Sequence, residues 1–137
     1  MKSMYSTLLQ SKYFNPAFNS AIFDGPIRIY FSQFHEALAL KVYFTLQQEL
    51  ASQMAQAKMI HKQTSRNILV MLYPTKVSFQ MSFEGKQTLL VKERLDDDNL
   101  IGINGPFEDE QLPEVINAIS DAISSWNFRP AVEEANL

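Results

Sequence analysis

The sequence predicts an α+β domain with a mostly antiparallel sheet, in the order β-α-β-β-β-β-α. Three observations predict it: a long helical pattern at residues 33–61, a series of short apolar or alternating segments between residues 68 and 103, and a second helical pattern at residues 109–127. Strands grouped apart from helices are typical of α+β folds. We therefore expect a long crossover helix and a C-terminal helix, packed together on one face of the sheet.

The bulk composition indicates one small globular domain. The chain has 137 residues, of which 46% are apolar and 20% charged, and it contains no cysteine. The missing cysteines exclude disulfides, thiolate metal sites and cysteine nucleophiles. The first residues lack the apolar run of a signal peptide, and no segment is long enough to cross a bilayer. We expect a small cytoplasmic protein of bacterial type, with no membrane contact.

Residues 1–26 are expected to form an arm, because Asn15-Pro16 and Asp24-Gly25-Pro26 interrupt any regular element. The arm is rich in aromatic side chains, which normally pack on another surface. These aromatic side chains are Tyr5, Tyr13, Phe14, Phe18 and Phe23. The arm is therefore expected to cover either its own domain or a second subunit.

The main domain is expected to span residues 27–130 and to begin with a strand at 27–31, followed by Ser32 as the cap of the long helix. The first half of that helix, residues 34–46, is apolar nearly all round, a pattern that predicts burial on every side. In the second half only a narrow apolar stripe remains among glutamines.

Residues 68–73 form an unbroken apolar run, which is typical of a central strand covered on both faces. Residues 76–83 then alternate as a strand does, with Ser78 and Gln80 expected to face outward. The side chains expected to face the core are Val77, Phe79, Met81 and Phe83.

Two further strands are expected at residues 87–95 and 100–103, the first after a Glu84-Gly85 hairpin turn. The last helix is expected to end at Arg129-Pro130, because proline cannot continue a helix easily. Residues 131–137 are expected to form a frayed tail.

No motif for catalysis, phosphate binding or a dinucleotide occurs in the chain, so no catalytic residue, metal or cofactor is expected. The nearest approach is a calcium-loop spacing that starts at Asp97. It lacks an oxygen ligand at Ile101 and has Asn104 where an apolar residue belongs. A basic cluster near the end of the long helix (Lys58, His61, Lys62 and Arg66) does not predict nucleic-acid binding, since the whole chain has a pI of about 5.3.

The apolar half-helix and the central strand together present more apolar surface than one two-layer domain can cover. Such surfaces usually mark protein contacts, so we expect a non-enzymatic protein-interaction or regulatory module that acts as a homodimer. The candidate interface residues are Leu40, Phe44, Leu50, Met54, Phe14 and Phe18. The alternative is a small-ligand sensor with a pocket between sheet and helices. The aromatic residues expected to line that pocket are Tyr30, Tyr43, Phe79 and Trp126.

Overall fold

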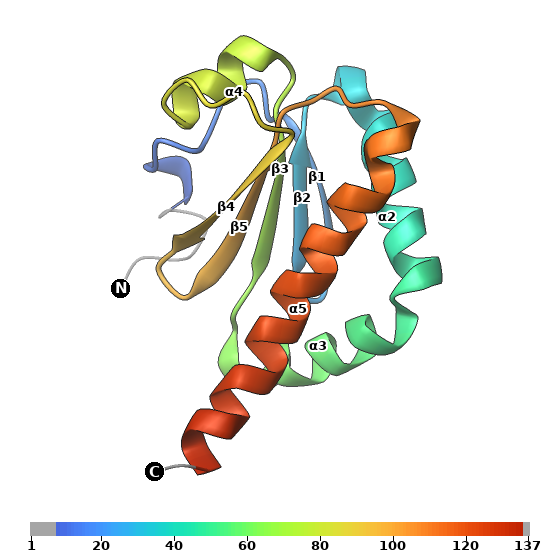
Figure 1. Cartoon of the computed structure of the whole chain (residues 1–137), viewed down its shortest axis with the longest axis vertical. Helices are drawn as coiled ribbons and strands as arrows, with labels where there is room; N and C mark the ends of the chain where they lie inside the picture. The colour runs from blue at the N-terminus through green and yellow to red at the C-terminus, as the bar shows by residue number, and fades with distance from the viewer. Residues whose placement is uncertain (1–7, 136–137) are drawn as a thin grey trace.

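The computed structural model describes the backbone of residues 8–135 and the side chains of residues 8–125. A five-stranded sheet in the order β1-β2-β3-β5-β4 runs through the middle of the molecule (Figure 1). Its strands are β1 (Ser20–Asp24), β2 (Ile27–Phe31), β3 (Ile68–Leu72), β4 (Leu90–Leu95) and β5 (Asp98–Ile103). Strands β2, β3 and β5 are parallel, and the two edge strands β1 and β4 are each antiparallel to their neighbour. The sheet is therefore mixed, and the expectation of a mostly antiparallel sheet is wrong.

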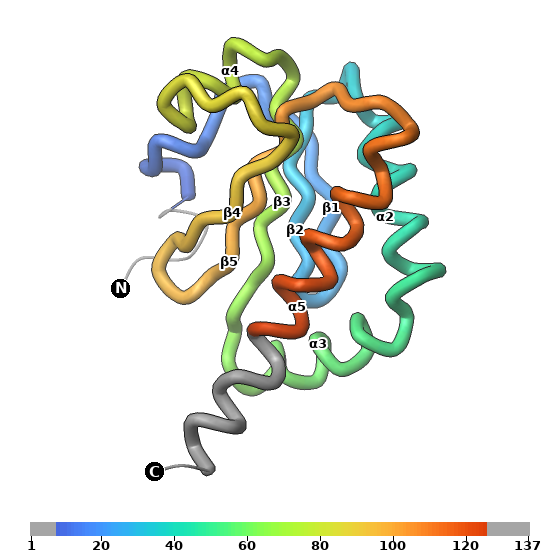
Figure 2. The backbone as a smooth tube through the Cα atoms, in the orientation of Figure 1, coloured from blue at the N-terminus to red at the C-terminus, as the bar shows by residue number. Residues whose placement is uncertain are grey.

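The helices lie on both faces of this sheet (Figures 1 and 2). One face is covered by α2 (Glu36–Glu49), α3 (Ala51–Thr64) and α5 (Leu112–Ala135), as their packing in one core with the sheet shows. The other face is covered by α4 (Lys76–Ser82) and by residues 8–18 of the arm. Two short 3-10 turns, η1 (Gln33–His35) and η2 (Asp109–Gln111), precede α2 and α5. The prediction that the crossover helix and the C-terminal helix share one face is confirmed.

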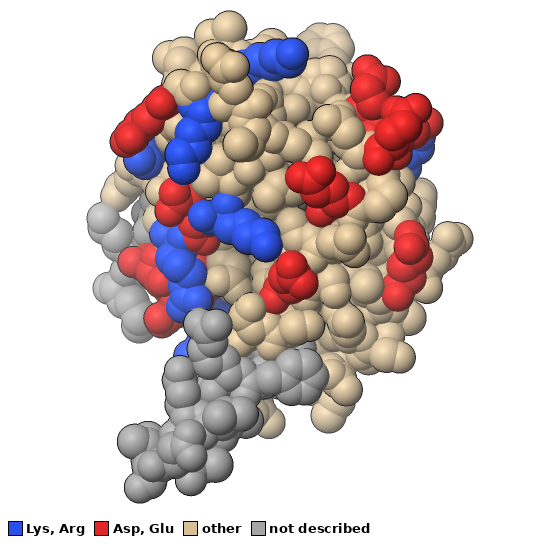
Figure 3. All heavy atoms as spheres, viewed as in Figure 1, with Lys and Arg blue, Asp and Glu red and all other residues tan. Residues whose placement is uncertain are grey.

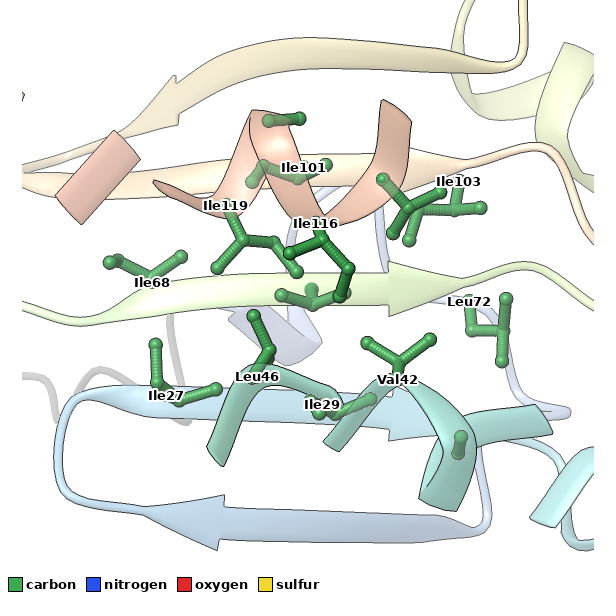
Figure 4. Close-up of a cluster of buried hydrophobic side chains, with 14 of the residues drawn as sticks. Ile27, Ile29, Val42, Leu46, Ile68, Leu72, Ile101, Ile103, Ile116 and Ile119 are labelled. Atoms are coloured by element: carbon green, nitrogen blue, oxygen red, sulfur yellow. The ribbon is translucent and has the colours of Figure 1, made fainter. Parts of the chain in front are cut away.

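The larger core lies between the sheet and the three long helices (Figure 4). Val42 and Leu46 of α2 and Ile116 and Ile119 of α5 all point at the sheet and are buried. Their spacing of three or four residues places each pair on one side of its helix. The sheet side chains that meet them are Ile27, Ile29, Ile68, Leu72, Ile101 and Ile103.

A second core fills the opposite face, where arm residues Leu8 and Phe18 pack with Phe79 and Phe83 of the α4 segment. The sheet contributes Tyr30, Leu69, Met71, Tyr73, Val91 and Leu100 to it. All five residues of β3 are buried, so the prediction of a central strand covered on both faces is confirmed. The third layer comes from the chain itself.

The long helix bends at Leu50, which leaves helical geometry (φ −119°, ψ 25°) and separates α2 from α3. Leu46, Leu50 and Met54, on either side of the bend and at it, all contact one core. The expectation of a helix buried on every side is wrong for α2, because Phe34 before it is 85% exposed and Phe44 on its outer side is 52% exposed.

The segment expected as a strand at residues 76–83 is a helix, α4. Thr75 caps it, since its hydroxyl accepts from the Ser78 N–H (3.0 Å) while the Ser78 hydroxyl accepts from the Thr75 N–H (3.2 Å). In a helix, Phe79 and Phe83 fall on one side and are buried, whereas Val77 and Met81 are 65% and 81% exposed. Ser78 is buried although it was expected outside, so the predicted sides are wrong for Val77, Ser78 and Met81, while Phe79 and Phe83 are buried as expected and Gln80 is partly exposed.

The remaining boundaries differ more modestly from the sequence prediction. Part of the arm forms the edge strand β1, and α5 continues to Ala135, beyond the Arg129-Pro130 stop. Tyr5 and the Trp126 side chain lie outside the described residues, as do the side chains of the predicted tail, 131–137. Within the described part of the chain, no helix combines the length and apolarity needed to cross a membrane.

Candidate functional site

An apolar groove of about 550 Å³ opens between the arm and the edge of the sheet formed by β1 and β2. It lies on the arm's side of the sheet, away from α2, α3 and α5. Its lining residues are Phe14, Phe18, Asn19, Ser20, Ala21, Phe23, Arg28 and Tyr30. This volume falls within the range of small-molecule pockets.

The floor of the groove follows from the pairing of β1 with β2. Ala21 lies opposite Tyr30, and Phe23 lies opposite Arg28, so these four side chains share one face of the sheet. Ala21 is small and leaves the floor low between larger neighbours. The rings of Phe23 and Tyr30 meet edge to face, with ring centres 5.8 Å apart, and Phe23 is 55% exposed.

The wall of the groove is the arm, held by contacts to the sheet. The rings of Phe14 and Phe18 meet edge to face at 6.0 Å, and Phe18 meets Tyr73 of the sheet at 5.1 Å. The Tyr73 hydroxyl donates to the Tyr13 carbonyl, and burial raises the pKa of Tyr73 to about 12. At the start of β1, the Asn19 side-chain carbonyl accepts from the Gln33 N–H (2.9 Å).

Arg28 supplies the only formal charge among the lining residues. Its guanidinium carbon lies 4.5 Å from the centre of the Phe23 ring, a cation–π contact. Its Nε donates to the Asn67 side-chain carbonyl (3.3 Å). In the part of the chain whose side chains are described, no carboxylate forms an ion pair with it. The groove therefore combines aromatic walls with an uncompensated positive charge.

Asn67 in turn is held by a buried carboxylate. Its backbone N–H donates to Asp98 at 2.7 Å. Burial raises the pKa of Asp98, and the hydrogen bonds from Asn67 oppose that shift. The Asp98 side chain thus points into the protein and orients Asn67, which Arg28 contacts. Asp98 belongs to the turn whose spacing resembles a calcium loop.

The outer edge of β1 borders the groove, and the hairpin geometry shows which backbone groups face outward. Asp24 lies opposite Ile27 across a two-residue loop. Residues that flank such a loop form a hydrogen-bonded pair, and bonded pairs alternate along antiparallel strands. Ile22 therefore bonds to β2, while the N–H and C=O groups of Ala21 and Phe23 point away from the sheet. No hydrogen bond within the described part of the chain uses those outward groups.

The two edges of the sheet differ in how they are protected. On β4, the consecutive charges Lys92, Glu93 and Arg94 are all exposed, and Figure 3 shows basic and acidic side chains together over this edge. Charged side chains on an edge strand oppose pairing with another chain. Strand β1, the outermost strand at the lower side of Figure 4, has no charge, proline or bulge within it until Asp24.

That terminal charge is compensated. Asp24 forms an ion pair with Lys58 of α3 (3.0 Å) and accepts a hydrogen bond from the Tyr43 hydroxyl of α2 (3.1 Å). Desolvation, and then the hydrogen bond to Asp24, raise the pKa of Tyr43. The β1 edge is consequently apolar, with a neutralised end.

The structure does not bring the six predicted interface residues together. Phe14 and Phe18 line the groove, while Met54 is buried in the core on the other face, where the partly buried Leu50 packs. Leu40 is partly exposed on α2. Of the residues expected in a ligand pocket, Tyr30 lines the groove, whereas Phe79 is core and Tyr43 lies on α2 across the sheet.

Sequence reasoning missed Ala21, Phe23 and Arg28. One signal was present: Phe23 and Arg28 flank the turn at residues 25–26 at positions that a two-residue hairpin places opposite each other. The chain matches no protein-family model, and comparison with curated proteins and with solved structures gives no match either.

Proposed function

We propose that the protein is a non-enzymatic protein-interaction module whose contact surface is the open edge of β1 together with the groove beside it. The contrast between the two sheet edges carries this proposal: β4 bears exposed charges of both signs, and β1 presents unused backbone groups beside apolar side chains. An added strand gains backbone hydrogen bonds at such an edge, and an adjacent pocket gives specificity for a side chain.

The lining of the groove supports binding over catalysis. Its polar residues are Asn19, Ser20, Arg28 and Tyr30, and none of these is a carboxylate or imidazole that could act as a general base near neutral pH. Aromatic side chains and arginine are the residue types that contribute most to protein contacts.

The sequence placed the contact surface on the long helix, and that helix remains a weaker candidate. Its exposed Phe44 lies in α2, where the helical backbone groups are already bonded to one another, and the exposed Phe34 lies in the η1 turn before it. The β1 edge offers side chains and backbone groups together.

Photo-cross-linking tests the proposal. A photoreactive phenylalanine analogue at position 23 is compared with the same analogue at Phe34, which is more exposed. In an extract of the source cells, we expect defined protein adducts from position 23 but not from position 34. Ala21→Pro should abolish them, because proline removes the outward N–H that a partner strand needs. The hydrogen bonds between β1 and β2 stay intact, since they do not use this N–H. Equal labelling at both positions, or adducts that survive Ala21→Pro, would contradict the proposal.

A second candidate, a small-ligand sensor, is favoured by the uncompensated charge of Arg28. The ligand would be an apolar molecule with a carboxylate, its ring among Phe14, Phe18 and Tyr30. The probe is 3-phenylpropionate: its addition should shift the amide resonances of residues 19–23, and Arg28→Gln should weaken the effect. Shifts spread over the whole protein would argue against this candidate.

A further inference from the structure

Resting on the proposed function, we infer that the partner at the β1 edge is a second copy of this chain, paired antiparallel about a two-fold axis at Ile22. A symmetric contact uses the same surface on both copies, so β1 must be complementary to itself. Its outward groups, its side chains and its charge meet that condition in turn.

The backbone fixes the register. The outward groups of Ala21 and Phe23 must meet outward groups of the other copy. With the axis at Ile22, Ala21 forms hydrogen bonds with Phe23 of the second copy. By symmetry, Phe23 forms the same bonds with Ala21 of the second copy, so the contact has two hydrogen-bonded pairs. An axis at Ala21 would need the N–H of Asn19, which already donates to Ala17 (2.8 Å). An axis at Phe23 would need the hairpin turn.

The side chains fit this register. Phe23 of the second copy would lie directly opposite Ala21, on the face that holds the groove. Cross-strand neighbours on one face stand about 4.5–5.5 Å apart at Cβ, so that ring enters the space above Ala21 and beside Tyr30. The half-exposed Phe23 ring of each copy would thus fill the groove of the other copy, whose walls include Phe14 and Phe18.

The charges do not oppose the pairing. Asp24 lies opposite Ser20 of the second copy, and Lys58 neutralises it within its own chain (3.0 Å). The pair of edges would join two sheets into one continuous sheet, leaving the charged β4 strands at both outer ends. The charge pattern of the two edges then has one explanation: β4 is protected and β1 is used.

A single cysteine gives the sharpest test, because the chain has none of its own. Ile22 would face Ile22 of the second copy in a non-hydrogen-bonded pair, with Cα atoms about 4.5 Å apart, within disulfide range. Two copies of position 21 would be offset by two residues, about 8 Å apart and outside that range. Ile22→Cys should therefore cross-link to a covalent dimer on mild oxidation, while Ala21→Cys and Glu93→Cys on the β4 edge should not.

The oligomeric state of the full chain is measured alongside by light scattering and sedimentation at high micromolar concentration. We expect a dimer, twice the 15.7 kDa of the chain, that becomes monomeric in Ala21→Pro while the circular dichroism stays unchanged. A monomeric wild type, or a dimer in which all three cysteines cross-link equally, overturns the inference.

The two proposals fail separately. If the purified chain stays monomeric but position 23 still gives adducts in the extract, the interaction surface at the β1 edge is supported and the self-pairing is contradicted. If the chain is monomeric and 3-phenylpropionate shifts residues 19–23, the groove serves a small ligand and self-pairing is again overturned.

Discussion

The Tyr73 hydroxyl donates a hydrogen bond to the backbone carbonyl of Tyr13, sixty positions earlier in the chain. Tyr73 is fully buried, and its ring also meets Phe18, Phe79 and Phe83. One residue at the end of β3 thus joins the arm to α4. The wall of the groove depends on this connection, because arm residues 8–19 have no strand pairing.

Tyr73→Phe removes the hydroxyl and leaves the ring. The variant should lose about 0.5–1.5 kcal/mol of unfolding free energy in urea, the usual net value of one hydrogen bond. The arm should loosen more than the fold, so tryptic cleavage after the exposed Lys12 should become faster than in the wild type. An unchanged cleavage rate would mean that the aromatic contacts alone fix the arm.

Phe79 and Met81 distinguish the helix α4 from the strand that alternation predicts. Phe79 is fully buried and Met81 is exposed. Phe79→Ala should cost about 3–5 kcal/mol, and Met81→Ala should stay within about 0.5 kcal/mol of the wild type. Equal losses from the two substitutions in denaturant unfolding would restore the strand interpretation.

Gly102 in β5 lies beneath the ring of Phe83. A Cβ at this position would stand 2.4 Å from two Phe83 ring atoms, closer than real contacts allow, so the ring would have to move. We expect Gly102→Ala to cost about 1–3 kcal/mol through overpacking. Phe83→Leu in the same chain should recover part of that loss. Thermal unfolding of the single and double variants measures it, and additive losses would contradict the prediction.

Asp98 makes stability depend on pH. Its pKa is raised in the folded protein above the ordinary 3.8. At a pH between the unfolded and the folded pKa, the folded state therefore binds more protons than the unfolded state. The corresponding stability is present at low pH and is lost as pH rises through the folded pKa. Asp98→Asn lacks this titration, so the stability difference should move in favour of the variant as the pH rises from below 3.8 through the folded pKa. A constant difference in urea unfolding across this range would contradict the prediction.

Local patterns predicted the elements that are locally determined. The unbroken run of β3 indicated burial on both faces, and the helical pattern at residues 109–127 indicated the last helix. Alternation misled at residues 76–83, because positions 79 and 83 are inward in a strand and also share one side of a helix. The sequence did contain one local sign of the helix, the Thr75–Ser78 capping pair, but the alternation pattern outweighed it.

The strand order and the groove depend on contacts distant in sequence. The parallel pairing of β3 with β5 follows only once residues 76–83 are removed from the sheet. Whether β1 or β4 forms an open edge cannot be judged before their positions in the sheet are known, although the charges of Lys92, Glu93 and Arg94 are plain in the sequence. Of the apolar surface expected to need a further layer, the second face of β3 is covered by α4 and by arm residues such as Leu8 and Phe18, whereas the outer side of the half-helix stays exposed at Phe44.

The arm also affects the order in which the molecule can assemble during synthesis. Its aromatic residues leave the ribosome before Tyr73 and Phe79, which receive them and follow about sixty residues later. A nascent chain that ends before Tyr73 has no complete surface for the arm, so its aromatic side chains must stay in water or with a chaperone. We expect the arm to dock late, and protease protection of Lys12 on stalled chains of increasing length should begin only after α4 has emerged.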